Sequence, residues 1–134
     1  MRYFLNRFFQ RYMKFYDFSE EDIQQVIRDI HEGRGISLGQ HLYKIRASAK
    51  GQGKRGGFRI IFFWKMEKHV IFCHLFSKSD KDNLNYKEMK ALHTLAQEYE
   101  TLTETDIENM LTYERLKEVI YDQTKGNIQH YGNG

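Results

Sequence analysis

The chain has 134 residues, of which 40% are hydrophobic and 29% charged, and a formal net charge of +3; this is the size of one domain that can bury a core without covalent cross-links. Its single cysteine, Cys73, excludes an internal disulfide and favours a reducing compartment, so we expect a cytoplasmic protein. Because Arg7, Arg11 and Lys14 interrupt the apolar N-terminus, neither a signal peptide nor a membrane span of ~20 apolar residues is expected.

The first third of the sequence has helical periodicity. Residues 3–16 carry apolar side chains at intervals of three and four, which predicts a first amphipathic helix. Ser19 then precedes an acidic turn with Asp22 three residues later, a capping-box pattern that begins a second helix. Gly33 is placed to end that helix. Two helices are therefore expected before any strand.

The middle of the sequence changes to strand periodicity. Residues 41–48 alternate between two faces, and residues 57–65 and 69–78 are rich in β-branched and aromatic residues. The MEK segment between the last two has the length of a hairpin loop. We expect three consecutive antiparallel strands, with the glycine-rich stretch KGQGKRGG joining the first to the second.

Helical signals return after Lys81. Asn85 with Glu88 forms a second capping box, and Thr105 with Glu108 repeats the pattern before an acidic terminal helix over residues 103–122, with a break near Thr112 as an alternative. Residues 123–134 lack periodicity and are expected to form a flexible tail. The prediction is a single α+β domain over residues 1–122, with a small antiparallel sheet of three to four strands on which two N-terminal helices and the C-terminal helices pack.

Two kinds of site find little support. The six histidines show no metal-binding spacing and Cys73 has no partner, so no metal site is expected. The segment GQGKRGG lacks both the dinucleotide and the P-loop patterns and has strands on both sides, which disfavours a nucleotide cofactor. His74, which strand alternation places with Phe72, Phe76 and Lys78, is as a lone histidine more often structural than catalytic.

The strongest functional signal is basic charge in the middle of the chain. Residues 41–81 carry ten Lys or Arg against two Asp or Glu, whereas residues 97–134 carry three against eight. Antiparallel pairing would bring strand residues Lys44, Arg46 and Arg59 together, with Lys78 and Lys81 at the end of the third strand. Such a group can bind two or three phosphates, which predicts a polyanionic partner. A merely solvated basic surface is the structural alternative.

The same residues are also compatible with RNA cleavage. Attack by the ribose 2′-hydroxyl needs a base, cationic stabilisation of the pentacovalent phosphate and an acid for the departing 5′-oxygen. Arg59 suits the second role, and a lysine among other cations can serve as base or acid because its charged form is disfavoured there. From the residues alone, a catalyst and a simple phosphate clamp both remain open.

The order of several short motifs resembles the RelE/HigB-like toxins of bacterial toxin–antitoxin systems. These motifs are YKIR, GQGKRGGFR, FSKSDKDNL and KEMKALHTLAQEY. The likeness extends from about Tyr3 to Asp122 and is greatest for the branch with a G-K-S-G-G-[FY]-R segment. It implies a RelE/ParE-like fold and a metal-independent endoribonuclease that cuts mRNA on the ribosome. It also implies a cognate antitoxin, with a helix-turn-helix domain expected.

The resemblance assigns roles to residues of this chain. It places Lys44, Arg46 and Arg59 at the basic positions that contact or activate the scissile phosphate, and it adds Lys54, Lys78 and Lys81 as substrate-binding or catalytic helpers. We therefore expect catalytic residues at Lys44, Arg46, Arg59, Lys78 and Lys81, and RNA-binding residues at Lys50, Lys54, Arg55, His74 and Asn83. The sequence departs from the branch pattern at Arg55, where serine is usual, and at Tyr86, which is shifted by one or two positions from a tyrosine that some relatives use. A ParE-like gyrase poison and a non-catalytic module that binds RNA or an antitoxin are the alternatives.

Overall fold

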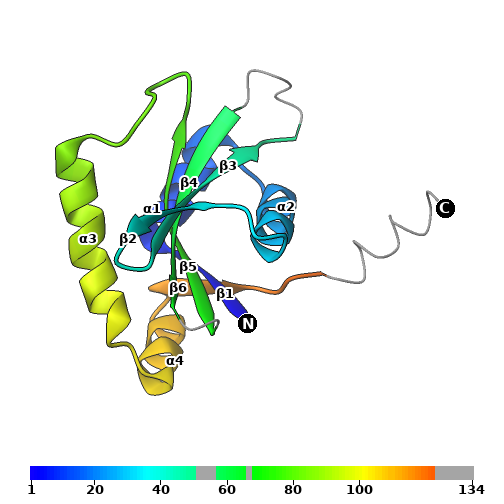
Figure 1. Ribbon diagram of the computed structural model, residues 1–134. Coiled ribbons are helices and arrows are strands. Elements are labelled where there is room, and N and C mark those ends of the chain that lie inside the picture. Colours follow the sequence, from blue (N-terminus) through cyan, green and yellow to red (C-terminus); the bar gives the residue numbers. More distant parts are fainter. Residues whose placement is uncertain (51–56, 66–67, 123–134) are drawn as a thin grey trace.

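The computed structural model describes residues 1–50, 57–65 and 68–122 (Figure 1). Four helices and six strands are found there, and none of these helices is long and apolar enough to cross a membrane. In chain order the elements are β1 (Arg2–Asn6), α1 (Arg7–Tyr16), α2 (Glu20–His31), β2 (Ile36–Gly39), β3 (Leu42–Ser48), β4 (Gly57–Lys65), β5 (His69–Ser77), α3 (Tyr86–Glu100), α4 (Glu104–Thr112) and β6 (Leu116–Val119). The expected tail, residues 123–134, lies outside this description.

All six strands form one sheet in the order β2-β3-β4-β5-β1-β6. Every neighbouring pair is antiparallel except β1 and β5, which run parallel. The three central strands agree with the sequence prediction within a residue at each end. The predicted strand count of three to four is wrong, because β1, β2 and β6 extend the sheet at both edges.

The predicted first helix begins too early. Residues Arg2–Asn6 form β1, and α1 starts only at Arg7. Leu5 fits the apolar period of the helix, but its backbone pairs with Phe72 of β5. Asn6 marks the change, because it is extended and its side chain accepts a hydrogen bond from the Phe9 N–H.

The predicted terminal helix is also shorter than expected. Helix α4 is capped by Thr103 and Asp106, two residues before the predicted pair, and it ends at Thr112, where the sequence suggested a break. Glu114 then adopts a positive φ of 59°, and the chain turns into β6. Leu116 and Val119 have helical spacing, yet both are buried in a strand that pairs with β1.

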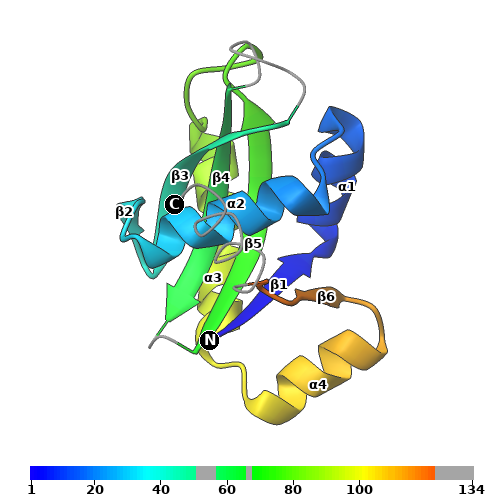
Figure 2. The same cartoon turned by 90° about the vertical axis from the view of Figure 1, so that its right-hand side faces the viewer.

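Helices cover both faces of the sheet, giving three layers. Figure 2 shows α2 in front of the sheet and α3 behind it. The first core lies under α1 and α2, where Phe9, Ile23 and Ile27 pack with Phe62 and Phe72. The second core lies under α3 and α4, and its buried members include Leu92, Tyr99, Ile107, Ile61 and Phe63. The predicted helices do pack on the sheet, but they divide between its two faces.

Candidate functional site

Two adjacent rows of side chains cross strands β3, β4 and β5. In one row Arg46 lies opposite Arg59, which lies opposite Phe76. Side chains that lie opposite one another share a face of a sheet. The neighbouring row is formed by Lys44, Ile61 and His74, and the Ile61 side chain belongs to the second core. The predicted strand cations therefore lie on the face that α3 packs against.

Arg46 and Arg59 are two like charges in directly opposed positions. In an antiparallel pair such residues have Cβ atoms ~4.5–5.5 Å apart, and like charges there destabilise the sheet. The Arg59 guanidinium donates a hydrogen bond to the Phe58 carbonyl at 3.2 Å. Among the described residues, no Asp or Glu forms an ion pair with either arginine, or with Lys44 or Lys78. A bound anion would supply the missing countercharge.

The segment between β5 and α3 contacts strands β3 and β4 and helix α1. The Lys78 N–H donates to the Gly57 carbonyl at 2.9 Å, and the Tyr16 hydroxyl donates to Asp80 at 2.7 Å. Lys44 Nζ donates a hydrogen bond to Asn83 Oδ1 at 3.4 Å, so this lysine contacts a neutral amide. These contacts bring the segment that carries Lys78, Lys81 and Asn83 to the strand cations, as the antiparallel pairing predicted.

Lys81 and His74 meet at Glu88 of α3. Lys81 Nζ forms an ion pair with the Glu88 carboxylate and lies 5.1 Å from the centre of the Phe76 ring. His74 Nε2 lies 3.3 Å from the same carboxylate, without hydrogen-bond geometry. Burial lowers the pKa of His74 below its usual value, and the Lys81 charge acts in the same direction. Its side chain is only 12% exposed, so it forms part of the wall of the site.

The pKa of Glu88 is lowered, although burial, the largest single effect on it, acts to raise it. Hydrogen bonds from the Asn85 backbone and from Lys81 outweigh burial, because both stabilise the carboxylate. The Asn85–Glu88 capping box was predicted from sequence. The contacts of Glu88 with Lys81 and His74 were missed, because they depend on how α3 packs against β5.

Because β5 contains a bulge, the environment of His74 differs from the predicted one. His74 pairs with Ile61 and Phe72 with Phe62, so Cys73 is an extra residue without a partner on β4. Phe72 consequently packs in the first core, on the face opposite to His74. Strict alternation, which placed the two residues together, is wrong at this point.

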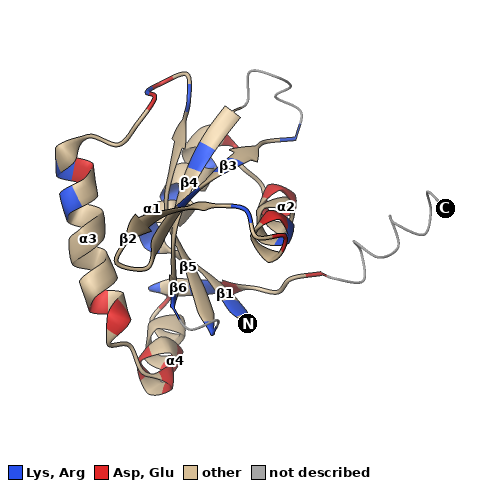
Figure 3. Cartoon of the chain, in the orientation of Figure 1, with Lys and Arg blue, Asp and Glu red and all other residues tan. Residues whose placement is uncertain are grey.

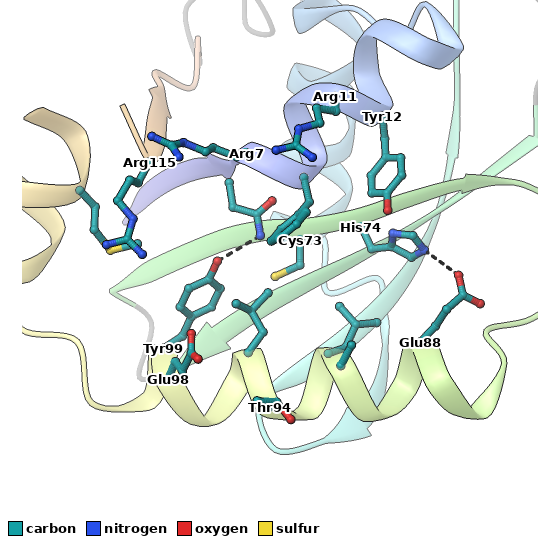
Figure 4. Close-up of a pocket in the computed structure, with 16 residues that line it drawn as sticks. Arg7, Arg11, Tyr12, Cys73, His74, Glu88, Thr94, Glu98, Tyr99 and Arg115 are labelled. Carbon is teal, nitrogen blue, oxygen red and sulfur yellow. Dashed lines mark hydrogen bonds and ion pairs between the residues drawn. The ribbon is translucent and has the colours of Figure 1, made fainter. Parts of the chain in front are cut away.

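An open groove of about 620 Å³ lies between α1 and α3 (Figure 4). Cys73 and Leu92 contribute apolar surface, Arg7 and Arg11 come from α1, and Glu88 and His74 lie at the end that borders the cationic rows. Burial raises the pKa of the Cys73 thiol to about 12, so the thiol is unreactive at neutral pH. No pattern in the sequence indicates this groove.

Two further basic residues, Lys50 and Lys65, are each paired with an acidic side chain. Lys50 is exposed at the end of β3 and pairs with Glu21 of α2 at 3.4 Å. Lys65, at the opposite end of β4, pairs with Glu100. Lys54 and Arg55 lie outside the described residues. Within the described part of the chain, no group of three His, Cys, Asp or Glu side chains is arranged to hold a metal ion.

A comparison with known protein families matches residues 1–119 to the RelE toxin of the RelE / RelB toxin–antitoxin system. The match runs from the first strand to the last and includes every described site residue. A family of this kind implies a cognate antitoxin as partner. The finer likeness to a HigB-like branch stays a prediction. Because the match covers most of the chain, the chain belongs to the RelE toxin family.

Proposed function

We propose that this toxin is a metal-independent endoribonuclease that cuts mRNA on the ribosome and so stops translation in the cytoplasm. The observation that supports this best is the opposed pair Arg46 and Arg59, which has no carboxylate partner among the described residues. Lys44 lies two residues from Arg46 on β3, and Lys81 contacts Phe76, which lies opposite Arg59. The family implies an antitoxin that neutralises the toxin, and we propose that this antitoxin carries a helix-turn-helix domain.

The proposed reaction is attack by the ribose 2′-oxygen on the adjacent phosphorus. The 2′-oxygen–phosphorus bond forms while the bond from phosphorus to the 5′-oxygen breaks, leaving a 2′,3′-cyclic phosphate and a 5′-hydroxyl. Arg46 and Arg59 bind the phosphoryl oxygens and stabilise their added charge in the transition state. This role needs permanent cations in fixed positions, which opposed strand residues provide.

Proton transfer completes the mechanism. A base must take the 2′-hydroxyl proton and an acid must give a proton to the departing 5′-oxygen. We assign the acid to Lys81, ahead of Lys78 and His74, because Lys81 lies beside the row that holds the arginines. We assign the base to Lys44, whose Nζ contacts the neutral Asn83 amide instead of a carboxylate. Lys50, Lys54, Arg55 and Asn83 are proposed to bind the flanking RNA.

The test is to induce the toxin and map cuts in ribosome-bound messages. Arg46→Ala and Arg59→Ala should each lower the cleavage rate by about 10²–10³-fold, the usual loss when one donor to a developing oxyanion is removed. Lys65→Ala is the matched control, because Lys65 lies on the same strand as Arg59 and is paired with Glu100. Lys65→Ala should leave cleavage unchanged.

Other outcomes would contradict the proposal. Growth arrest without any cut message would exclude the nuclease, and a DNA-damage response with intact messages would indicate a ParE-like gyrase poison. If Lys44→Arg and Lys81→Arg both retain full toxicity, proton transfer by these lysines is excluded. A non-catalytic module that binds RNA or the antitoxin would then fit better.

A further inference from the structure

Glu88 divides its two carboxylate oxygens between two tasks. Oε1 accepts a hydrogen bond from the Asn85 N–H at 3.0 Å and so completes the capping box of α3. Oε2 pairs with Lys81. The same oxygen lies 3.3 Å from His74 Nε2, and Figure 4 shows this second contact. The side chain is 25% exposed. One residue thus contacts both the start of α3 and the cation beside the arginine pair.

We propose that Glu88 is a positioning residue that holds Lys81 beside Arg59 in the geometry needed for proton transfer. This inference rests on the proposed nuclease function and adds a residue to it. Among the described residues, Lys81 forms no ion pair with any other acidic side chain. Without Glu88, the contact of the Lys81 ammonium that remains among the described residues is the cation–π contact with the Phe76 ring.

The other capping boxes of the chain show that capping alone does not need the second oxygen. In α4, Asp106 Oδ2 accepts from the Thr103 N–H at 2.9 Å, and Asp106 has no ion pair among the described residues. In α2, Asp22 uses its second oxygen to accept from the Lys50 N–H at 2.8 Å, which ties a backbone segment to the helix. Glu88 uses its second oxygen to hold a charged side chain of the proposed site.

The substitution Glu88→Gln separates the two tasks. Glutamine also serves as the third residue of a capping box, so the helix start is preserved. Its neutral amide cannot form the ion pair with Lys81. A displacement of a catalytic group by about 1 Å can cost up to ~100-fold in rate, so we expect kcat to fall by about 10- to 100-fold with little change in KM.

The experiment is a double-mutant cycle on purified toxin with ribosome-bound mRNA. Glu88→Gln is measured alone and in a Lys81→Ala background, with thermal melting to confirm the fold. Asp106→Asn, the equivalent change in α4, is the control and should leave kcat unchanged. If Glu88 acts through Lys81, Glu88→Gln lowers kcat in the parent toxin and has no further effect once Lys81 is alanine.

Two results would overturn the inference. One is an unchanged kcat for Glu88→Gln, and the other is an equal loss in both backgrounds, which would indicate a structural role. Arg59→Ala, measured in the same assay, keeps the two proposals apart. If Arg59→Ala is inactive while Glu88→Gln is fully active, only the positioning role fails. If Arg59→Ala cuts normally, the nuclease site itself is wrong.

Discussion

Asn6 is a buried polar residue at the point where β1 becomes α1. Its Oδ1 accepts from the Phe9 N–H at 2.8 Å, and its Nδ2 donates to the Tyr99 hydroxyl of α3 at 3.0 Å. Burial, the main cause, raises the pKa of Tyr99 well above its usual value, so this hydroxyl remains neutral. A single side chain thus caps one helix and joins it to a helix on the other side of the sheet.

We expect Asn6→Ala to lower the free energy of unfolding by about 2 kcal/mol, because it removes an N-cap and leaves the Tyr99 hydroxyl without its buried partner. Asn6→Ser should recover part of the loss, since serine can still cap α1. Urea unfolding measures both values. Asn109→Ala, on the exposed surface of α4, should stay within about 0.5 kcal/mol of the parent. An equally small effect of Asn6→Ala would contradict the prediction.

Among the elements, β6 and α4 are held to β1 by Arg2. Its guanidinium donates to both oxygens of Glu118, at 2.9 and 2.8 Å, and to Glu108 of α4 at 3.1 Å. This two-point geometry is stronger than that of an ordinary surface ion pair. The hydrogen bonds from Arg2 are the largest cause of the lowered pKa of Glu118.

We expect Arg2→Gln to lower the stability by about 1–2 kcal/mol at neutral pH and to speed hydrogen exchange in β6. Because the Glu118 pKa is lower in the folded state, its contribution is complete above the unfolded value of about 4.5 and is lost as the pH falls through the folded value. The difference between parent and Arg2→Gln should therefore shrink on acidification below about pH 4.5.

Unfolding at a series of pH values tests this dependence. Lys117→Gln is the control, since Lys117 forms an exposed single contact with Glu20 and should contribute less than about 1 kcal/mol. A difference between parent and Arg2→Gln that stays constant down to pH 3 would contradict the assignment to Glu118.

The elements that the sequence predicted well are those whose signals are local. The capping boxes fixed the starts of α2 and α3, and residues 57–65 had unmistakable strand composition. Strands β1 and β6 could not be found in this way, because their apolar residues have helical spacing and only pairing with each other and with β5 makes them strands.

The residues of the site also differ in how well the sequence predicts them. Lys44, Arg46 and Arg59 come together through one antiparallel pairing of adjacent strands, whereas Glu88 reaches Lys81 only through tertiary packing.

Over the whole molecule, basic and acidic side chains are partly separated along the sheet. Figure 3 shows basic segments on the upper parts of β3 and β4 and acidic segments on α4 at the bottom. Arg2 pairs with Glu108 of α4, and Lys65 pairs with Glu100 at the end of α3, so both add little to the basic end. A polyanion is therefore attracted to the end that carries the arginine pair, although the net charge of the chain is only +3.

This separation predicts how salt affects the binding of single-stranded RNA. Each phosphate that the protein neutralises contributes about −0.7 to the slope of log K against log salt, so two or three contacts give a slope of roughly −1.4 to −2.1. Arg46→Gln and Lys44→Gln should each make the slope shallower by about 0.7, measured by titration at several salt concentrations. Lys65→Gln has the same nominal change in charge, but its lysine is already paired with Glu100 at the far end of β4. If Lys65→Gln makes the slope shallower by as much as Arg46→Gln does, RNA binding responds to the net charge of the protein. The arginine pair would then not be a specific phosphate site. If only Arg46→Gln and Lys44→Gln make the slope shallower, Lys44 and Arg46 are the side chains that neutralise RNA phosphates and release their counterions.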